Sequence, residues 1–148
     1  MKLFNNILIT NDDGYDALGL NILKKCLKRF STNVYVVAPQ KNKSASGRSI
    51  TLRKKINFKQ VSDFDWIVDG TPTDAMILAL NHVFKDFNPD FVFSGINAGS
   101  NVGDEISYSG TVGAAFESAL RGIPSAALSQ HSENNKLFNF DVAKKNLP

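Results

Sequence analysis

The sequence ILITNDDG at residues 7–14 is a short apolar run, rich in β-branched residues, that ends in two adjacent carboxylates and a glycine. An apolar run of this length bounded by turn-forming residues is typical of a buried β-strand that stops at a turn. Residues 33–38 form a second apolar run, which Pro39 ends. Between the two runs, apolar residues recur at helical spacing at Leu23, Cys26, Leu27 and Phe30. This order predicts a β-α-β unit with parallel strands.

Strand-like segments continue along the rest of the chain. Short extended pieces are expected at residues 50–52 and 66–68, and buried strands at 91–93 and 125–129. The order of these strands in the sheet cannot be predicted from the sequence.

Two further helices are expected between these strands. The stretch TPTD at 71–74 predicts a helix start, with Thr71 as N-cap and Pro72 in the first turn, and its expected buried face is Met76, Ile77, Leu80, Val83 and Phe84. Another helix follows residues 109–111, with an expected apolar face of Val112, Ala115, Phe116, Ala119 and Leu120. Alternating strands and helices predict an α/β fold, a three-layer α/β/α sandwich around a Rossmann-like, mostly parallel sheet, in a single domain over residues 1–148.

The composition is that of an ordinary globular domain, since 43% of the 148 residues are hydrophobic and 21% are charged. No apolar run approaches the ~18 residues that a membrane span needs, so no membrane partner is expected. The single cysteine, Cys26, is predicted to be a buried thiol in a reducing compartment, which favours the cytoplasm.

The net charge of +3 comes from basic residues that gather in one part of the chain. They are Lys41, Lys43, Arg48, Arg53, Lys54, Lys55 and Lys59. A solvated basic face and a field that attracts a phosphate-bearing substrate both explain this cluster. No nucleic-acid-binding motif accompanies the charge, so no specific nucleic acid is predicted as a partner.

Asp12 and Asp13 stand at the end of the first predicted strand, where two like charges repel each other and lose hydration unless a cation lies between them. Adjacent residues of a regular strand point to opposite faces, so joint binding of one cation requires a turn, which Gly14 permits. The alternative is that one carboxylate caps the next helix while the other is solvated. These residues alone leave both interpretations open.

Polar loops after two other strands bring Ser44 and Asn97 to the same edge of the predicted sheet, which is where open α/β sheets bind ligands. Carboxylate, hydroxyl and amide oxygens are hard ligands, so this set favours Mg²⁺ or Mn²⁺ over structural zinc. His82 and His131 have no partner at metal-binding spacing, so we interpret them as ordinary satisfied or solvated side chains.

Ser109, Gly110 and Thr111 place two hydroxyls and unpaired amides at a predicted helix N-terminus, which is a ready anion site. Plain N-capping is the alternative. Competing motifs can be excluded, because the chain has no P-loop and no glycine-rich dinucleotide motif in its first β-α turn. The Asp-Phe-Asp at 63–65 does not follow a buried strand, so we interpret it as an exposed turn.

Five segments, in order, resemble the signatures of the SurE family of metal-dependent nucleotidases. They are ILITNDDG (7–14), VVAP with SASGRSIT (36–39 and 44–51), GTPTD (70–74), SGINAGSNVG (94–103) and SGTV (109–112). Each segment alone is a weak signal, but five in order over roughly residues 6 to 130 are specific.

The resemblance implies that Asp12, Asp13, Ser44 and Asn97 hold one divalent cation, Mg²⁺ or Mn²⁺, and that Asp12, Asp13 and Asn97 are catalytic. It places Asn11, Ser109, Gly110 and Thr111 at the phosphate, and Gly70, Thr71 and Asp74 in a supporting shell. The implied reaction is hydrolysis of nucleoside 5′-monophosphates, or of 3′-monophosphates, to nucleoside and phosphate. Homo-oligomers are implied as well.

Family members continue beyond the position where this chain stops, so we expect a fold shortened at its C-terminus. Two hypotheses follow. The chain is an active 5′-nucleotidase, or it is a truncated or split nucleotide-binding chain that is inactive or needs a partner.

Overall fold

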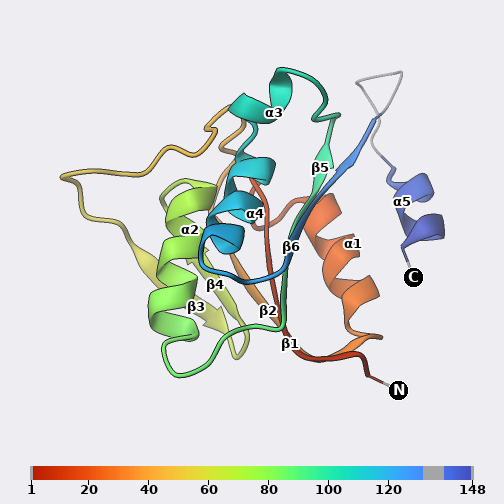
Figure 1. The fold of residues 1–148 in the computed structure, drawn as a ribbon, viewed down its shortest axis with the longest axis horizontal. Helices are drawn as coiled ribbons and strands as arrows, with labels where there is room; N and C mark the ends of the chain where they lie inside the picture. Colours follow the sequence, from red (N-terminus) through yellow and green to blue (C-terminus); the bar gives the residue numbers. More distant parts are fainter. Residues whose placement is uncertain (1, 132–138, 148) are drawn as a thin grey trace.

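The computed structural model describes residues 2–131 and 139–147, and in this part of the chain six strands form one sheet with helices on both faces (Figure 1). The strands are β1 (Phe4–Thr10), β2 (Ser31–Pro39), β3 (Phe58–Ser62), β4 (Asp65–Val68), β5 (Phe91–Ala98) and β6 (Ser125–Gln130). The helices are α1 (Leu18–Leu27), α2 (Pro72–Leu78), α3 (Glu105–Tyr108), α4 (Gly110–Leu120) and α5 (Asp141–Asn146). A π-helical stretch over Ala79–Val83 continues α2.

The sheet order is β3-β4-β2-β1-β5-β6, and every neighbouring pair is parallel except β3 with β4. β1 lies near the middle, with Ile9 opposite Val36 of β2 on one side and Phe93 of β5 on the other. The predicted α/β fold with a mostly parallel sheet is therefore confirmed. The exposed edge strand β3 pairs antiparallel to β4, which is the arrangement that a short two-residue connection permits.

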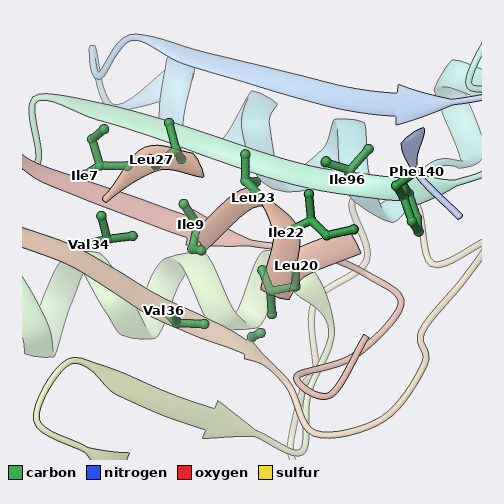
Figure 2. Packing of buried hydrophobic residues seen from close by; sticks show 11 residues of the cluster. Ile7, Ile9, Leu20, Ile22, Leu23, Leu27, Val34, Val36, Ile96 and Phe140 are labelled. Carbon is green, nitrogen blue, oxygen red and sulfur yellow. The ribbon is translucent and has the colours of Figure 1, made fainter. Parts of the chain in front are cut away.

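Helices cover both faces of the sheet, as Figure 1 shows: α2 and α4 lie on one side, and α1 lies on the other. Successive side chains of a strand point to opposite faces, so β1 supplies both cores. Ile7 and Ile9 pack beneath α1 with Leu20 and Leu23 (Figure 2), whereas Leu8 packs beneath α2 with Met76. The helices of the described residues include none that is long and apolar enough to cross a membrane.

The packing face predicted for α4 is wrong in part, because Ala115 is buried but Phe116, Ala119 and Leu120 are exposed. Phe116 and Leu120 are 47% and 61% exposed, whereas the buried side of this helix carries small residues, among them Ala114 and Ser118. Small side chains let α4 approach the sheet and α2 closely, which large side chains on that face would prevent. Apolar periodicity therefore selected the wrong side of the helix.

Further local expectations differ from the structure. The interpretation of Asp-Phe-Asp at 63–65 as an exposed turn is wrong for Asp65, which is 4% exposed and begins β4. Residues 50–52 lie in no strand, and the edge strand in this part of the chain is β3. Phe30 lies beyond the end of α1 and is half-buried, and Cys26 is half-buried rather than buried. Leu23 and Leu27 are buried as predicted.

The chain order within the sheet locates the expected ligand site. From β1 the chain passes to the neighbouring β2, then to the edge strand β3 and back to β4, which lies between β3 and β2. It later crosses to the other side of β1 to form β5 and β6. The strand order therefore reverses between β1 and β5. Ligands of open α/β sheets bind at such a switch point, beyond the carboxyl ends of the strands.

Candidate active site

The turn after β1 is held by the side chain of Asn11, which is fully buried. Its Nδ2 donates a hydrogen bond of 2.8 Å to the carbonyl of Gly14, and its Oδ1 accepts one of 3.3 Å from the Gly14 amide. Gly14 has a φ of +106°, which a residue with a Cβ rarely adopts, so the glycine lets the chain turn at this point. In this structure Asn11 shapes the turn, and its role at a phosphate stays a prediction.

Asp12 is 3% exposed, and its Oδ1 accepts a hydrogen bond of 2.6 Å from the hydroxyl of Thr111. Burial raises the pKa of Asp12 above its usual 3.8, and the nearby charge of Asp13 raises it too, while the Thr111 hydrogen bond works in the opposite direction. Within residues 2–131 and 139–147, neither carboxylate forms an ion pair with a basic side chain. A cation at this position would remove the cost of ionising Asp12.

Asp13 is half-buried, and its carboxylate lies toward the end of β5. Its Oδ2 accepts a hydrogen bond of 3.0 Å from the backbone amide of Ala98, the residue after Asn97. Consecutive carboxylates are thus fixed by different elements, Asp12 by α4 and Asp13 by β5. The register between β5 and β6 shifts between Ser94 and Asn97, and such an irregularity changes where the following side chains point.

A cavity of about 310 Å³ lies at this edge of the sheet, and its walls include Asp12, Ser44, Asn97 and Ser109. Nδ2 of Asn97 donates a hydrogen bond of 3.0 Å to the carbonyl of Gly99. This bond fixes the orientation of the Asn97 side-chain amide. Asp12, Ser44, Asn97 and Ser109 therefore meet around one space, although Asn97 lies near the end of β5 and not in a loop after it. Asp13 does not line this cavity, although its hydrogen bond to Ala98 keeps it next to the cavity wall.

The N-terminus of α4 closes the site. The Ser109 hydroxyl accepts a hydrogen bond of 3.1 Å from the amide of Val112, so Ser109 is the N-cap and can still donate its own proton outward. A Cβ on Gly110 would lie 2.6 Å from Ser46 Oγ and 2.8 Å from Asp12 Cβ. Only glycine therefore allows this close approach, and it leaves the first amides of α4 beside the carboxylate.

The third predicted segment, GTPTD at residues 70–74, supports the loop that carries Ser44. Thr71 and Asp74 form a capping box at the start of α2, in which the Asp74 amide donates to Thr71 Oγ1 and the Thr71 amide donates to Asp74 Oδ2. The same carboxylate also accepts hydrogen bonds from the amide and hydroxyl of Thr51, and a Cβ on Gly70 would lie 2.5 Å from Asp74 Oδ2. These contacts hold the end of the loop that carries Ser44, and none of them reaches Asp12.

Sequence reasoning missed two features of the site. The hydroxyl of Thr111 donates a hydrogen bond to Asp12, which the sequence did not predict, and the role of Thr111 at a phosphate stays a prediction. Ser46 Oγ is buried beside Asp12 and Gly110, and it has no hydrogen-bond partner among the described residues. Its position inside the segment SASGRSIT was a usable signal, but nothing in the sequence distinguished Ser46 from Ser44.

The chemistry of the donors suits a hard divalent cation. No group of three or more His, Cys, Asp or Glu side chains gathers anywhere in the described residues. A cation here would therefore use the two carboxylates together with neutral oxygens from Ser44 and Asn97, as Mg²⁺ and Mn²⁺ do. A larger cavity of about 430 Å³ opens at the other edge of the sheet, near Lys28 and Asp63, and none of the predicted site residues lines it.

Comparison with known proteins gives a consistent result. The family model for survival protein SurE matches residues 7–147. A 5′-nucleotidase SurE of Paramagnetospirillum magneticum is 48% identical over 128 residues, which cover 86% of this chain and 49% of the relative. The protein of the same name from Campylobacter lari is 48% identical over 140 residues, 93% of this chain and 54% of the relative. The chain thus spans about half the length of these relatives.

A solved structure shows the same fold. The crystal structure of the SurE protein from Aquifex aeolicus superimposes with a TM-score of 0.87 at 38% sequence identity. The match covers 95% of this chain and 56% of the other.

Proposed function

Because this chain belongs to the survival protein SurE family, we propose that it is a divalent-metal-dependent phosphatase that hydrolyses nucleoside 5′-monophosphates to nucleoside and phosphate. The named relatives are 5′-nucleotidases, and they match 86% and 93% of this chain.

One observation carries the proposal. Asp12 is buried without a basic partner among the described residues, next to a second carboxylate and to the N-terminus of α4. A buried carboxylate beside a half-buried one is costly, and a helix N-terminus alone does not neutralise both charges. A divalent cation does, and it leaves positive charge for a phosphate next to the amides of α4.

The site residues have two kinds of role, metal binding and phosphate binding. Asp12 and Asp13, with the oxygens of Ser44 and Asn97, hold one Mg²⁺ or Mn²⁺. When bound, such an ion polarises the phosphoryl group and lowers the pKa of coordinated water. The Ser109 hydroxyl and the Gly110 amide donate hydrogen bonds to phosphate oxygens, which stabilises the charge that develops there.

The remaining residues position these groups. Thr111 holds Asp12 through its 2.6 Å hydrogen bond, and Asp74 steadies the loop that carries Ser44 through its hydrogen bonds from Thr51. The basic residues between 41 and 59 supply a field that favours the approach of an anionic substrate. A reducing, cytoplasmic location belongs to the same proposal, because the one cysteine has no partner for a disulfide within the chain.

Phosphate release from AMP is the test. We expect the 148-residue chain to release phosphate with Mn²⁺ or Mg²⁺, to stop after chelation, and to recover when the metal is restored. The same assay with 3′-AMP measures the preference between the two monophosphates. Absence of phosphate release under all metal conditions would overturn the proposed activity, and AMP binding without turnover would support the alternative of a nucleotide-binding chain that needs a partner.

A further inference from the structure

One aromatic residue lines the 310 Å³ cavity, directly beside the proposed phosphate site. This residue is Tyr108, and no other aromatic residue of the described part of the chain lines the cavity. Tyr108 is 67% exposed, so its ring is open to a ligand as well as to solvent. An exposed aromatic ring on a cavity wall offers a flat apolar surface for stacking.

The backbone of Tyr108 is fixed on both sides. Its carbonyl accepts a hydrogen bond of 2.8 Å from the amide of Gly47, in the loop that carries Ser44. The next residue, Ser109, is the N-cap of α4 and donates its own amide to the carbonyl of Ile106 over 3.4 Å. A ring on a fixed backbone loses little conformational freedom when a ligand stacks on it, because a tyrosine side chain has only two rotatable bonds that matter.

The other exposed aromatic rings of residues 2–131 and 139–147 already have partners. Phe64 meets the ring of Tyr35 edge-on at 5.1 Å, Phe87 meets Phe84 at 5.1 Å, and the guanidinium of Arg48 lies 4.3 Å from the ring of Phe116. Tyr108 makes no ring contact with any described residue. Its ring is therefore not engaged by another ring or by a cation, in contrast to the other exposed rings of the described residues.

We propose that Tyr108 is the surface on which the base of a bound nucleoside monophosphate stacks. This inference rests on the proposed function and adds a specificity-determining residue to it. Tyr108 and Ser109 are adjacent, so their Cα atoms are about 3.8 Å apart, and a phosphate held by Ser109 and Gly110 leaves its sugar and base next to the ring. Stacking does not read base edges, so the site accepts different bases and discriminates nucleotides from simple sugar phosphates.

The test compares a ligand that has a base with one that lacks it. AMP and ribose 5-phosphate share the sugar and phosphomonoester, and only AMP can stack. We expect Tyr108→Ala to raise KM for AMP by about tenfold or more, which is the size of a lost base–aromatic stack, and to leave ribose 5-phosphate unaffected. Tyr108→Phe retains the ring and is expected to behave as the unsubstituted chain. Phe64→Ala removes an exposed ring far from the cavity and serves as the matched control.

Calorimetric binding of both ligands with Mn²⁺ separates this proposal from the proposed activity. Tighter binding of AMP than of ribose 5-phosphate, lost in Tyr108→Ala but kept in Tyr108→Phe, supports the stacking role even for a chain that shows no turnover. Equal affinity for the two ligands, failure of AMP to bind, or an equal loss of both ligands in Tyr108→Ala would overturn it.

Discussion

The hydroxyl of Thr111 donates a hydrogen bond of 2.6 Å to Oδ1 of Asp12, and both residues are buried. This bond joins the first turn of α4 to the turn after β1, and so it fixes a carboxylate that we assign to the metal. Thr111→Val keeps the shape of the side chain but removes the donor. We expect it to cost about 1–3 kcal/mol in the free energy of unfolding and to weaken Mn²⁺ binding about 10- to 100-fold.

Thr111→Ser is the control for that substitution, because it retains the hydroxyl. Urea denaturation and a Mn²⁺ titration of the two variants measure both effects. A Thr111→Val chain that binds Mn²⁺ as tightly as the unsubstituted chain would show that the hydrogen bond does not position Asp12 for the metal.

Asp12→Asn should abolish phosphate release and, without metal, leave stability equal or higher. Burial first, and then the charge of Asp13, raise the pKa of Asp12 above 3.8. A carboxyl whose pKa is higher in the folded chain favours folding below the unfolded pKa of about 4, and this contribution is lost as pH rises through the folded pKa. The asparagine has no such loss, so the stability of the variant relative to the unsubstituted chain should increase from pH 4 to pH 7.

Urea denaturation at the two pH values, with a chelator present, measures this difference. Added Mn²⁺ should stabilise the unsubstituted chain and leave Asp12→Asn unchanged, since only the former binds it. A variant that is less stable than the unsubstituted chain at pH 7 without metal would contradict the account.

A partly buried ion pair anchors the last turn of α1 to the sheet. Lys24 Nζ lies 2.6 Å from Asp65 Oδ1, and the Tyr15 hydroxyl donates to Asp65 Oδ2 over 2.8 Å. Burial and this carboxylate raise the pKa of Tyr15 from 10.0 to about 12. We therefore expect the stabilising contribution of Tyr15 to be present below pH 10 and to be lost as the pH rises through about 12.

Ultraviolet absorbance during alkaline titration follows the tyrosines directly. One of the three should titrate about two units above the ordinary value, and Asp65→Asn should lower that pKa. Tyr15→Phe identifies the signal by removing it. An unchanged titration in Asp65→Asn would show that the carboxylate does not hold the Tyr15 proton.

Phosphomonoesters should react much faster than phosphodiesters. A phosphodiester such as cyclic AMP has one ionisable oxygen fewer, so the donors at Ser109 and Gly110 would lose part of their ligand. The loss of one such donor interaction is worth on the order of 100-fold in rate, so we expect at least this preference for AMP. Parallel assays of product release from AMP and cyclic AMP measure it, and equal rates would contradict a phosphate site at the N-terminus of α4.

The sequence predicted the parts of this site that local chemistry determines. Two carboxylates and a glycine after a buried strand indicated the turn at 11–14, and polar loops after parallel strands had to meet at one edge. The capping box at Thr71 and Asp74 follows from spacing within one turn of helix, and it is present in the structure.

Features that depend on packing between distant segments could not be predicted. The buried side of α4 is its small-residue side, because neighbouring elements approach closely, and apolar periodicity instead selected the side with Phe116 and Leu120. The use of the Thr111 hydroxyl on Asp12 and the position of the Tyr108 ring on the cavity wall depend on the same close approach of α4. The order of the strands was unreadable for the same reason, since pairing is decided between segments that are far apart in sequence.

Calorimetric titration with Mn²⁺ tests the central claim, a cation site built on Asp12 and Asp13, without relying on turnover. We expect one ion bound per chain. Asp12→Asn and Asp13→Asn should each lose that binding, and both variants should remain folded by circular dichroism. His82→Gln, which changes a residue outside the site, should bind as the unsubstituted chain does. Absence of Mn²⁺ and Mg²⁺ binding, or binding that survives in both aspartate variants, would contradict the account.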